Sequence, residues 1–280
     1  MHISLDSAHI NIPVYIISFN RKTYLKRLVE WLERKNFRNI TIVDNNSTYP
    51  PLLEYLTSLP YRVVRLEENF GHLAVWKCGK FADILAKKFF IVTDPDILPE
   101  ETCPDDVIMR FQAYLAAHPR ITKCGFSLRI DDIPECHPLR ASIIKVEREY
   151  WKNPLPDGSG FFAPIDTTFA LYRPGITPND PRWFDSIRLA PPYIARHLPW
   201  YKNPDAPDEE ILFYKNTVQI QSTFWTASDS ASLKRENLAL RERIAELETQ
   251  TELLSKGIGD RMTVILYKIL RNIRKKLLSQ

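Results

Sequence analysis

Two carboxylates separated by one proline, Asp94 and Asp96, have the residue type and spacing that most clearly suggest chemistry. They follow the apolar segment 89–93 (FFIVT), which predicts a buried strand. Neighbouring carboxylates are costly to bury unless a cation lies beside them, and Mg²⁺ and Mn²⁺ prefer such oxygens while leaving room for phosphate. The pair therefore predicts a Mn²⁺ or Mg²⁺ site that holds a diphosphate. This prediction requires both acids to face a cavity and to be free of a lysine or arginine partner.

Strands and helices alternate around this motif. The apolar, β-branched segments that predict strands are 13–18, 40–44, 62–66 and 89–93. The helical patterns between them cover residues 22–35, 51–59 and 72–88. This order predicts a parallel, helix-covered sheet, in which ligands bind at the carboxyl ends of the strands. Each predicted strand is followed by polar or acidic residues, so we expect a site along this one rim.

Composition limits the class of protein. The chain has 280 residues, 44% of them hydrophobic and 26% charged, enough for one large domain or two small ones. We expect no signal peptide and no membrane span, because no basic leader precedes an apolar segment and no apolar run reaches about 18 residues. The four cysteines form no CxxC pair and predict free thiols in a reducing cytoplasm. P-loop and GxGxxG motifs are absent from the sequence.

The positive net charge of +4 comes from the C-terminal end. Residues 261–280 carry six basic residues and no acid, so the rest of the chain has 32 basic and 34 acidic residues, a balance of −2. Because the basic residues gather on one short segment and not on the body, we expect no nucleic-acid binding.

The segment from about 120 to 228 is irregular. Residues 123–130 and 162–173 have strand patterns, and the second places Asp166 within an apolar strand. Proline-rich and aromatic-rich stretches surround them, too apolar for disorder. We expect this part of the chain to wrap over the sheet and form a pocket.

A heptad pattern follows, in residues 229–256 and slightly beyond. Apolar and a few polar residues alternate at spacings of four and three, at Leu233, Asn237, Leu240, Ile244, Leu247, Thr251, Leu254 and Ile258. This pattern predicts a coiled coil that forms a homo-oligomer, and the asparagine at an a position favours a dimer over a trimer. The alternative is a single amphipathic helix packed on the body.

The last segment, 257–280, has apolar residues at helical spacing and basic residues on the opposite face. A basic amphipathic helix without acids is typical of a segment that lies on an anionic membrane surface. Docking on a partner protein or on the body is the alternative. We therefore expect a cytoplasmic protein that is peripheral on the inner face of the cell membrane.

The order of four motifs resembles one known family. IPVYIISFNR, TIVDNNS, EENFGHLAVWK and FFIVTDPDILPE within residues 10–110 resemble the nucleotide-sugar-binding half of GT-A glycosyltransferases, in particular those of family 2. The resemblance implies an α/β fold of the GT-A (Rossmann-like) type over residues 1–228, with a donor half at 1–110 and an acceptor half at 111–228. It implies donor binding, with a UDP-sugar favoured, by Ser18, Asn20, Arg21, Asp44, Asn69, Gly71 and Asp94, and metal binding by Asp94 and Asp96.

The family also needs a general base that deprotonates the acceptor hydroxyl. An acidic pair that opens a helix usually supplies it, and DEEILFY at 208–214 resembles that element. Glu209 and Glu210 are the candidates and Asp208 is the reserve, although acids also occur at helix N-termini because they complement the helix dipole. Trp200 and Tyr201 could stack on an acceptor sugar or belong to the core. Asp166 is either an acceptor-site acid or a polar group with a structural partner.

Together these features predict a metal-dependent glycosyltransferase that acts on a glycan or lipid-linked acceptor in surface polysaccharide synthesis. The family resemblance implies that it inverts the configuration at the anomeric carbon. The alternative is a non-catalytic scaffold with a nucleotide-sugar fold, which oligomerises and recruits partners to the membrane. A phosphoryl-transfer enzyme of the haloacid-dehalogenase kind ranks far below both, because its DxD motif follows the first strand and not the fourth.

Overall fold

Nine strands of the described chain form one mixed sheet in the computed structural model, which describes residues 11–203 and 206–218. The strands are β1 (Val14–Ser18), β2 (Ile40–Asp44), β3 (Arg62–Arg65), β4 (Phe90–Thr93), β5 (Ile97–Pro99), β6 (Lys123–Leu128), β7 (Gly160–Phe162), β8 (Ala170–Tyr172) and β9 (Ser186–His197). Their order is β3-β2-β1-β4-β8-β6-β9-β5, with β7 paired to β9. The first four strands run parallel, and β8 is antiparallel to both of its neighbours.

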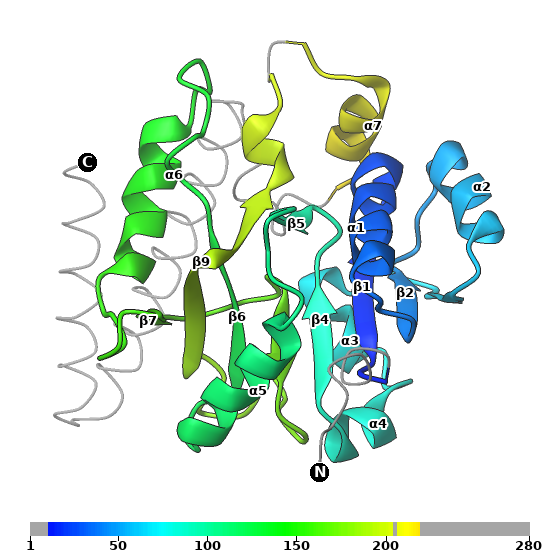
Figure 1. Cartoon of the computed structure of the whole chain (residues 1–280). Helices are drawn as coiled ribbons and strands as arrows, with labels where there is room; N and C mark the ends of the chain where they lie inside the picture. Colours follow the sequence, from blue (N-terminus) through cyan, green and yellow to red (C-terminus); the bar gives the residue numbers. More distant parts are fainter. Residues whose placement is uncertain (1–10, 204–205, 219–280) are drawn as a thin grey trace, which may run out of the picture. The chain divides into compact units, whose positions relative to one another are not determined.

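Helices cover both faces of this sheet (Figure 1). The α-helices are α1 (Lys22–Arg34), α2 (Pro50–Ser58), α3 (Ala74–Lys77), α4 (Ala82–Lys87), α5 (Val107–Ala117), α6 (Arg140–Glu147) and α7 (Glu209–Thr217). The short 3-10 helices are η1 (Gly71–Leu73), η2 (Arg148–Trp151) and η3 (Leu198–Tyr201).

Alternate residues of the central strands point to opposite faces, and each face has its own core. Ile16 of β1 packs with Leu25 of α1 and Phe111 of α5 on one face. Tyr15, its neighbour, packs with Val75 of α3 on the other. Because every residue of β1 and β2 is buried, the strands read as continuous apolar runs, as expected for a sheet covered on both sides.

The predicted elements of the first half agree with the structure to within a residue or two, except for the helix expected over 72–88. That segment divides into η1, α3 and α4. Gly79 lies at the break with a φ of +70°, a left-handed conformation that glycine adopts without strain and that ends a helix.

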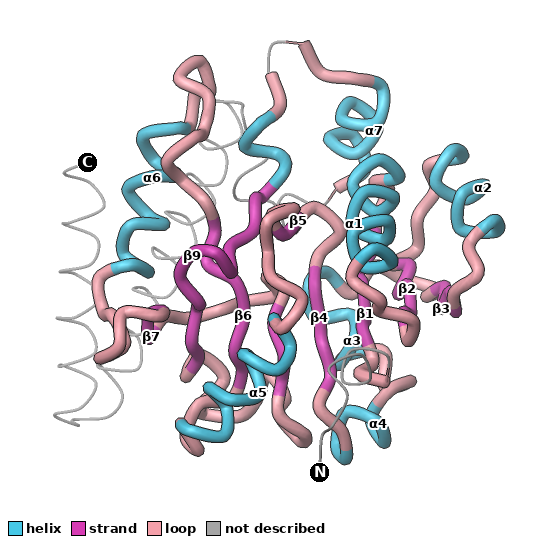
Figure 2. The backbone as a smooth tube through the Cα atoms, viewed as in Figure 1, coloured by secondary structure: helices cyan, strands magenta, loops and turns pink. Residues whose placement is uncertain are grey.

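The second half differs more from expectation (Figure 2). Residues 162–173 do not form one strand, because β7 ends at Phe162 and β8 begins only at Ala170. The expected parallel sheet is therefore mixed, with β8 running against β4. Asp166 lies in the loop between β7 and β8, which corrects its expected position within a strand.

Close contact between neighbouring chain segments depends on one glycine of β6. A Cβ atom added at Gly125 would lie 2.4 Å from the carbonyl oxygen of Phe169, just before β8. Only glycine permits this approach without a shift of the backbone. The contact brings the β7–β8 loop onto the sheet, next to the end of β4.

The coiled coil predicted at 229–256 and the basic helix predicted at 257–280 lie outside the described residues. Within the described part of the chain, none of the helices combines the length and the apolar character that crossing a bilayer requires.

Candidate active site

A cavity of about 420 Å³ opens at the carboxyl ends of the parallel strands. Residues after all four of these strands line it, at Arg21, Asn45, Gly71 and Asp94, as the sequence predicted for a single rim. The opposite wall comes from the second half of the chain. Its lining residues include Glu147, Tyr150, Asp166, Thr167, Arg188, His197, Trp200 and Tyr214.

Two asparagines connect the strand ends of the rim. Asn20, after β1, accepts hydrogen bonds through Oδ1 from the backbone N–H groups of Thr48 and Tyr49, at 2.7 and 2.9 Å. Asn45, after β2, accepts one from the N–H of Phe70 and donates one to the carbonyl of Gly71. These bonds satisfy the backbone groups that strand ends leave open, and they hold the rim in one arrangement.

Asp96 is paired with a buried arginine. The guanidinium of Arg21 donates to its Oδ2, and Nε2 of His197 lies 3.4 Å from the same oxygen. The Arg21 guanidinium also lies 3.7 Å from the ring centroid of Tyr214 in α7. Although burial alone would raise the pKa of Asp96, the charge of Arg21 and the contact with His197 hold it well below its usual range. Asp96 is therefore a permanent anion with a fixed orientation.

Asp94 has a different environment. Its Oδ2 accepts a hydrogen bond of 2.6 Å from the hydroxyl of Thr167, and its N–H donates to the Thr167 carbonyl. Among the described residues, no lysine, arginine or histidine forms an ion pair with it. Burial and the nearby charge of Asp96 raise the pKa of Asp94 well above its usual value. Asp94 is thus the carboxylate of this pair that still lacks a cation.

Part of the condition set for the metal prediction is not met. Asp94 and Asp96 both line the cavity, but Asp96 is bound to Arg21. Both partners of Asp96 contact Oδ2, and Oδ1 has no side-chain partner among the described residues. The assignment of an enzyme class therefore cannot depend on the two acids alone.

A second buried ion pair lies in the opposite wall. Nη1 of Arg188 in β9 donates to Glu147 at the end of α6, at 3.1 Å. Nε of Arg188 donates to the carbonyl of Pro164, and the guanidinium lies 4.1 Å from the ring centroid of Tyr150. Burial raises the pKa of Glu147, while the Arg188 charge opposes this.

Asp166 reaches into the same cavity from the β7–β8 loop, and its side chain is 61% exposed. Nε2 of His72 in η1 lies 3.8 Å from its Oδ1. The hydroxyl of Tyr172 donates to its carbonyl, and the bonds of Thr167 to Asp94 hold the next residue. The loop therefore places an accessible carboxylate close to Asp94.

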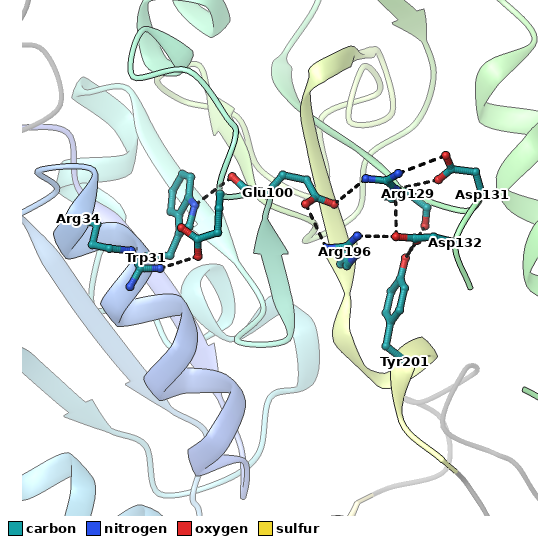
Figure 3. Close-up of polar contacts among 9 residues, drawn as sticks. Trp31, Arg34, Glu100, Arg129, Asp131, Asp132, Arg196 and Tyr201 are labelled. Carbon is teal, nitrogen blue, oxygen red and sulfur yellow. Dashed lines mark hydrogen bonds and ion pairs between the residues drawn. The ribbon is translucent and has the colours of Figure 1, made fainter. Parts of the chain in front are cut away.

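A polar network joins the residue after β5 to β9 and to the segment after β6 (Figure 3). β5 pairs with β9 so that Ile97 lies opposite His197. Glu100, after β5, bonds to Arg129 and Arg196, and Arg196 bonds to Asp132. Because these charges are paired across three segments, the network fixes the register that brings His197 beside Asp96.

Several predicted site residues line the cavity and others do not. Those that line it are Arg21, Asn69, Gly71, Asp94, Asp96, Asp166 and Trp200. Ser18, Asn20, Asp44 and Tyr201 are outside the lining. Asp44 is fully buried and pairs with Arg65 at 2.9 Å, and Tyr201 donates to Asp132. Asn20, Asp44 and Tyr201 instead form contacts that support the rim or the wall at β9.

The acids at 208–210 also lie outside the cavity lining. Glu210 accepts hydrogen bonds from the backbone N–H and the hydroxyl of Thr23, in the first turn of α1. Asp208 caps α7 by accepting from the N–H of Ile211 and pairs with Lys202. These carboxylates bind helix N-termini, where open N–H groups and the helix dipole favour negative charge. This placement differs from the one expected for a general base.

Sequence reasoning did not assign roles to Glu147, Tyr150, Arg188, His197 or Tyr214. Each lies far along the chain from the DPD motif, and all but Tyr214, which belongs to the helix expected at 208–214, lie in segments without a regular pattern. A partial signal exists for Arg188, which is a charged residue within the apolar segment that forms β9. No local pattern marks Tyr214, since its role depends on the packing of α7 against the start of α1.

Comparison with known proteins agrees with this geometry. No curated protein matches the chain. The model of Glycosyl transferase family 2 matches residues 14–170, more than half of the chain, and this confirms the resemblance seen in the motifs. The mixed α/β sheet is consistent with a GT-A fold, and enzymes of this family bind a nucleotide-sugar donor and an acceptor and commonly use divalent metals. The chain therefore belongs to Glycosyl transferase family 2 and is a glycosyltransferase.

Proposed function

We propose that this protein transfers a hexosyl or related residue, with inversion, from a nucleotide-sugar (a UDP-sugar favoured) to a glycan or lipid-linked acceptor. The observation that carries the proposal is the meeting of Asp94 and Asp96 with an accessible third carboxylate, Asp166, in one cavity at the strand ends. A role in surface polysaccharide synthesis follows from the expected membrane-surface tail and rests on the sequence pattern alone.

Mn²⁺ or Mg²⁺ is the expected cofactor, and the residues present fit such an ion. Asp94 is a carboxylate that needs a cation, and Asp96 offers Oδ1 while Arg21 and His197 orient its other oxygen. No three acidic, histidine or cysteine side chains of the described chain already form a coordination cluster. The donor phosphates and water would therefore supply the remaining ligands. Bound there, the metal would neutralise charge on the departing diphosphate.

The protein's own groups would perform the other tasks. Arg21 would place positive charge and His197 a hydrogen-bonding imidazole at the diphosphate end of the cavity, where they would stabilise the charge that develops as the nucleotide leaves. Asn69 and Gly71 line the side after β3 and would contact the nucleotide.

Asp166 is our candidate for the general base. It is the carboxylate of the cavity lining with the greatest exposure, and neither an arginine nor a lysine of the described chain forms an ion pair with it. It would accept the proton of the acceptor hydroxyl as that oxygen attacks the anomeric carbon. Glu209, Glu210 and Asp208 were the candidates by sequence, but the helix-capping contacts of Glu210 and Asp208 explain those two acids without catalysis.

Two variants distinguish these candidates. Asp166→Asn should lower kcat by about 10²–10⁴-fold with donor binding unchanged, because a general base contributes about that much. Glu210→Gln should retain the wild-type kcat. It should lower the free energy of unfolding by about 1 kcal/mol, the typical value of a helix cap. The opposite result would indicate that the general base is one of the acids at 208–210.

The class of reaction is tested by calorimetric titration of nucleoside diphosphates with and without Mn²⁺. We expect one nucleotide to bind tightly only with the metal, and Asp94→Ala to abolish this response. If no nucleotide binds under either condition, the scaffold alternative replaces the enzyme. Measurements of oligomeric state and of binding to anionic vesicles, on the full chain and on a chain ending at residue 228, test the tail separately.

A further inference from the structure

The charges that face the cavity lead to an inference about the donor sugar, which rests on the proposed function. Its described lining contains two arginines and no lysine. Arg21 is paired with Asp96 and Arg188 with Glu147, and in each pair both side chains are more than nine-tenths buried. No guanidinium of the lining is therefore left to bind a carboxylate of the ligand.

The acids of the lining outnumber these arginines. Asp94 and Asp166 remain without an arginine or lysine partner among the described residues, and His72 and His197 each lie beside a carboxylate. One divalent ion would offset the two additional negative charges, and the donor diphosphate then brings more. A further carboxylate on the sugar would enter this site without a partner and would lose its hydration. Hydroxyl groups, in contrast, can donate hydrogen bonds to these oxygens.

We infer that the donor sugar is uncharged, a neutral hexose or its N-acetylated form and not a uronic acid, and that Glu147 determines this specificity. Glu147 holds the Arg188 guanidinium, which lies against Tyr150 in the wall of the cavity. Without the negative charge of Glu147, the Arg188 guanidinium would be an unbalanced cation able to attract a sugar carboxylate.

The test uses pairs of donors that differ only at C6, namely UDP-glucose with UDP-glucuronate and GDP-mannose with GDP-mannuronate. Binding constants are measured by calorimetry with Mn²⁺ on the full chain, so no acceptor has to be known. We expect the wild-type protein to bind the uncharged member of the preferred pair about 100-fold more tightly, since like charges in one site cost several kcal/mol. Equal or tighter binding of the uronate overturns the inference.

Glu147→Gln keeps a hydrogen-bond acceptor for Arg188 and should reduce the preference by about tenfold, the effect of one unbalanced charge near a partly solvated site. Glu149→Gln, on the exposed side of the same segment, is the matched control and should leave it unchanged. A Glu147→Gln protein that folds and keeps the wild-type preference removes Glu147 from this role. If the wild-type protein binds no nucleoside diphosphate, the result contradicts the proposed function and not this inference alone.

Discussion

Two buried arginine–carboxylate pairs face the same cavity and are built alike. In each, a guanidinium bonds to a carboxylate and lies over a tyrosine ring, at 3.7 Å for Arg21 on Tyr214 and at 4.1 Å for Arg188 on Tyr150. Each pair also joins segments that are far apart in sequence. Buried pairs of this kind contribute little net stability but are costly to break, so their presence points to a role in the site.

The pairs differ in what surrounds the carboxylate. Burial raises the pKa of both carboxyl groups, and an arginine and His197 oppose it in both. At Asp96 the neighbours prevail and the pKa is lowered, whereas at Glu147 burial prevails and the pKa is raised. Asp96 also has an unpaired acid beside it, Asp94, and Glu147 has none in the same turn. The first pair thus holds a permanent charge next to a group that needs a cation, and the second makes a nearly neutral wall. Under the proposed function, the first pair belongs to the diphosphate end of the cavity and the second to the sugar end.

Removing the unpaired acid should have the largest effect. We expect Asp94→Asn to lower kcat/KM by about 10³-fold, equivalent to about 4 kcal/mol of transition-state stabilisation, because the cation at the leaving group is lost. Steady-state kinetics with Mn²⁺ measures this. The control is Asp83→Asn, an exposed aspartate of α4 outside the cavity lining, which should retain wild-type kinetics. Retention of activity by Asp94→Asn would mean that the first pair lacks the role assigned to it.

Breaking each pair from the arginine side compares them directly. Arg21→Met should lower the free energy of unfolding by about 3 kcal/mol at pH 7, because Asp96 is left buried and charged. Arg188→Met should cost less as the pH is lowered, because Glu147 already has a raised pKa and can accept a proton. Urea unfolding at pH 5.5 and pH 7.5 measures both. Equal losses with equal pH dependence would show that the environments of the two pairs do not differ.

A third basic side chain, Lys123, is buried but forms no ion pair with a carboxylate of the described chain. Nζ of Lys123 lies 3.6 Å from the Trp183 ring centroid, and burial lowers the pKa of Lys123 to about 7. Because the unfolded chain keeps this proton up to about pH 10.4, the stability of the folded state should increase as pH rises from 7 towards 10. Lys123→Met should raise the free energy of unfolding by about 1–2 kcal/mol at pH 6 and by less at pH 9. Thermal and urea unfolding at both pH values test this, and a uniform effect would contradict it.

The smallest effect concerns the proton that competes with the metal. Because the pKa of Asp94 is raised, the folded protein without metal retains a proton that the unfolded chain loses above about pH 4. Between that pH and the pKa of Asp94 in the folded state, this group therefore lowers the free energy of unfolding as the pH rises. Mn²⁺ should reverse the trend, and its affinity should increase by up to about tenfold per pH unit below the pKa of Asp94. Calorimetry between pH 5.5 and 8 measures this, and Asp94→Asn should remove the dependence. A pH-independent affinity would exclude Asp94 as a ligand.

β1, β2 and β4 were predictable because burial on both faces makes each of them a continuous apolar run. β3 is largely exposed and was predictable from its β-branched residues and its place in the alternating order. The residues after these four strands were predictable as a rim, since parallel strands end at one edge. The prediction was weaker for the side chains themselves: Asn20 and Asp44 occur at the expected positions but serve the backbone and Arg65. Polar residues at strand ends have both structural and binding uses, and sequence does not separate the two.

Local patterns in the chain were sufficient to establish the parallel half of the sheet, the carboxylates at the end of β4 and the family. They also suggest an oligomeric, lipid-binding tail, which lies outside the described residues. The opposite wall of the cavity depends on contacts between distant segments: Tyr214 on Arg21, Glu147 on Arg188, and Thr167 on Asp94. Such contacts form only when the irregular second half packs on the sheet, and no periodicity encodes them, because each depends on the three-dimensional distance between residues and not on their spacing along the chain.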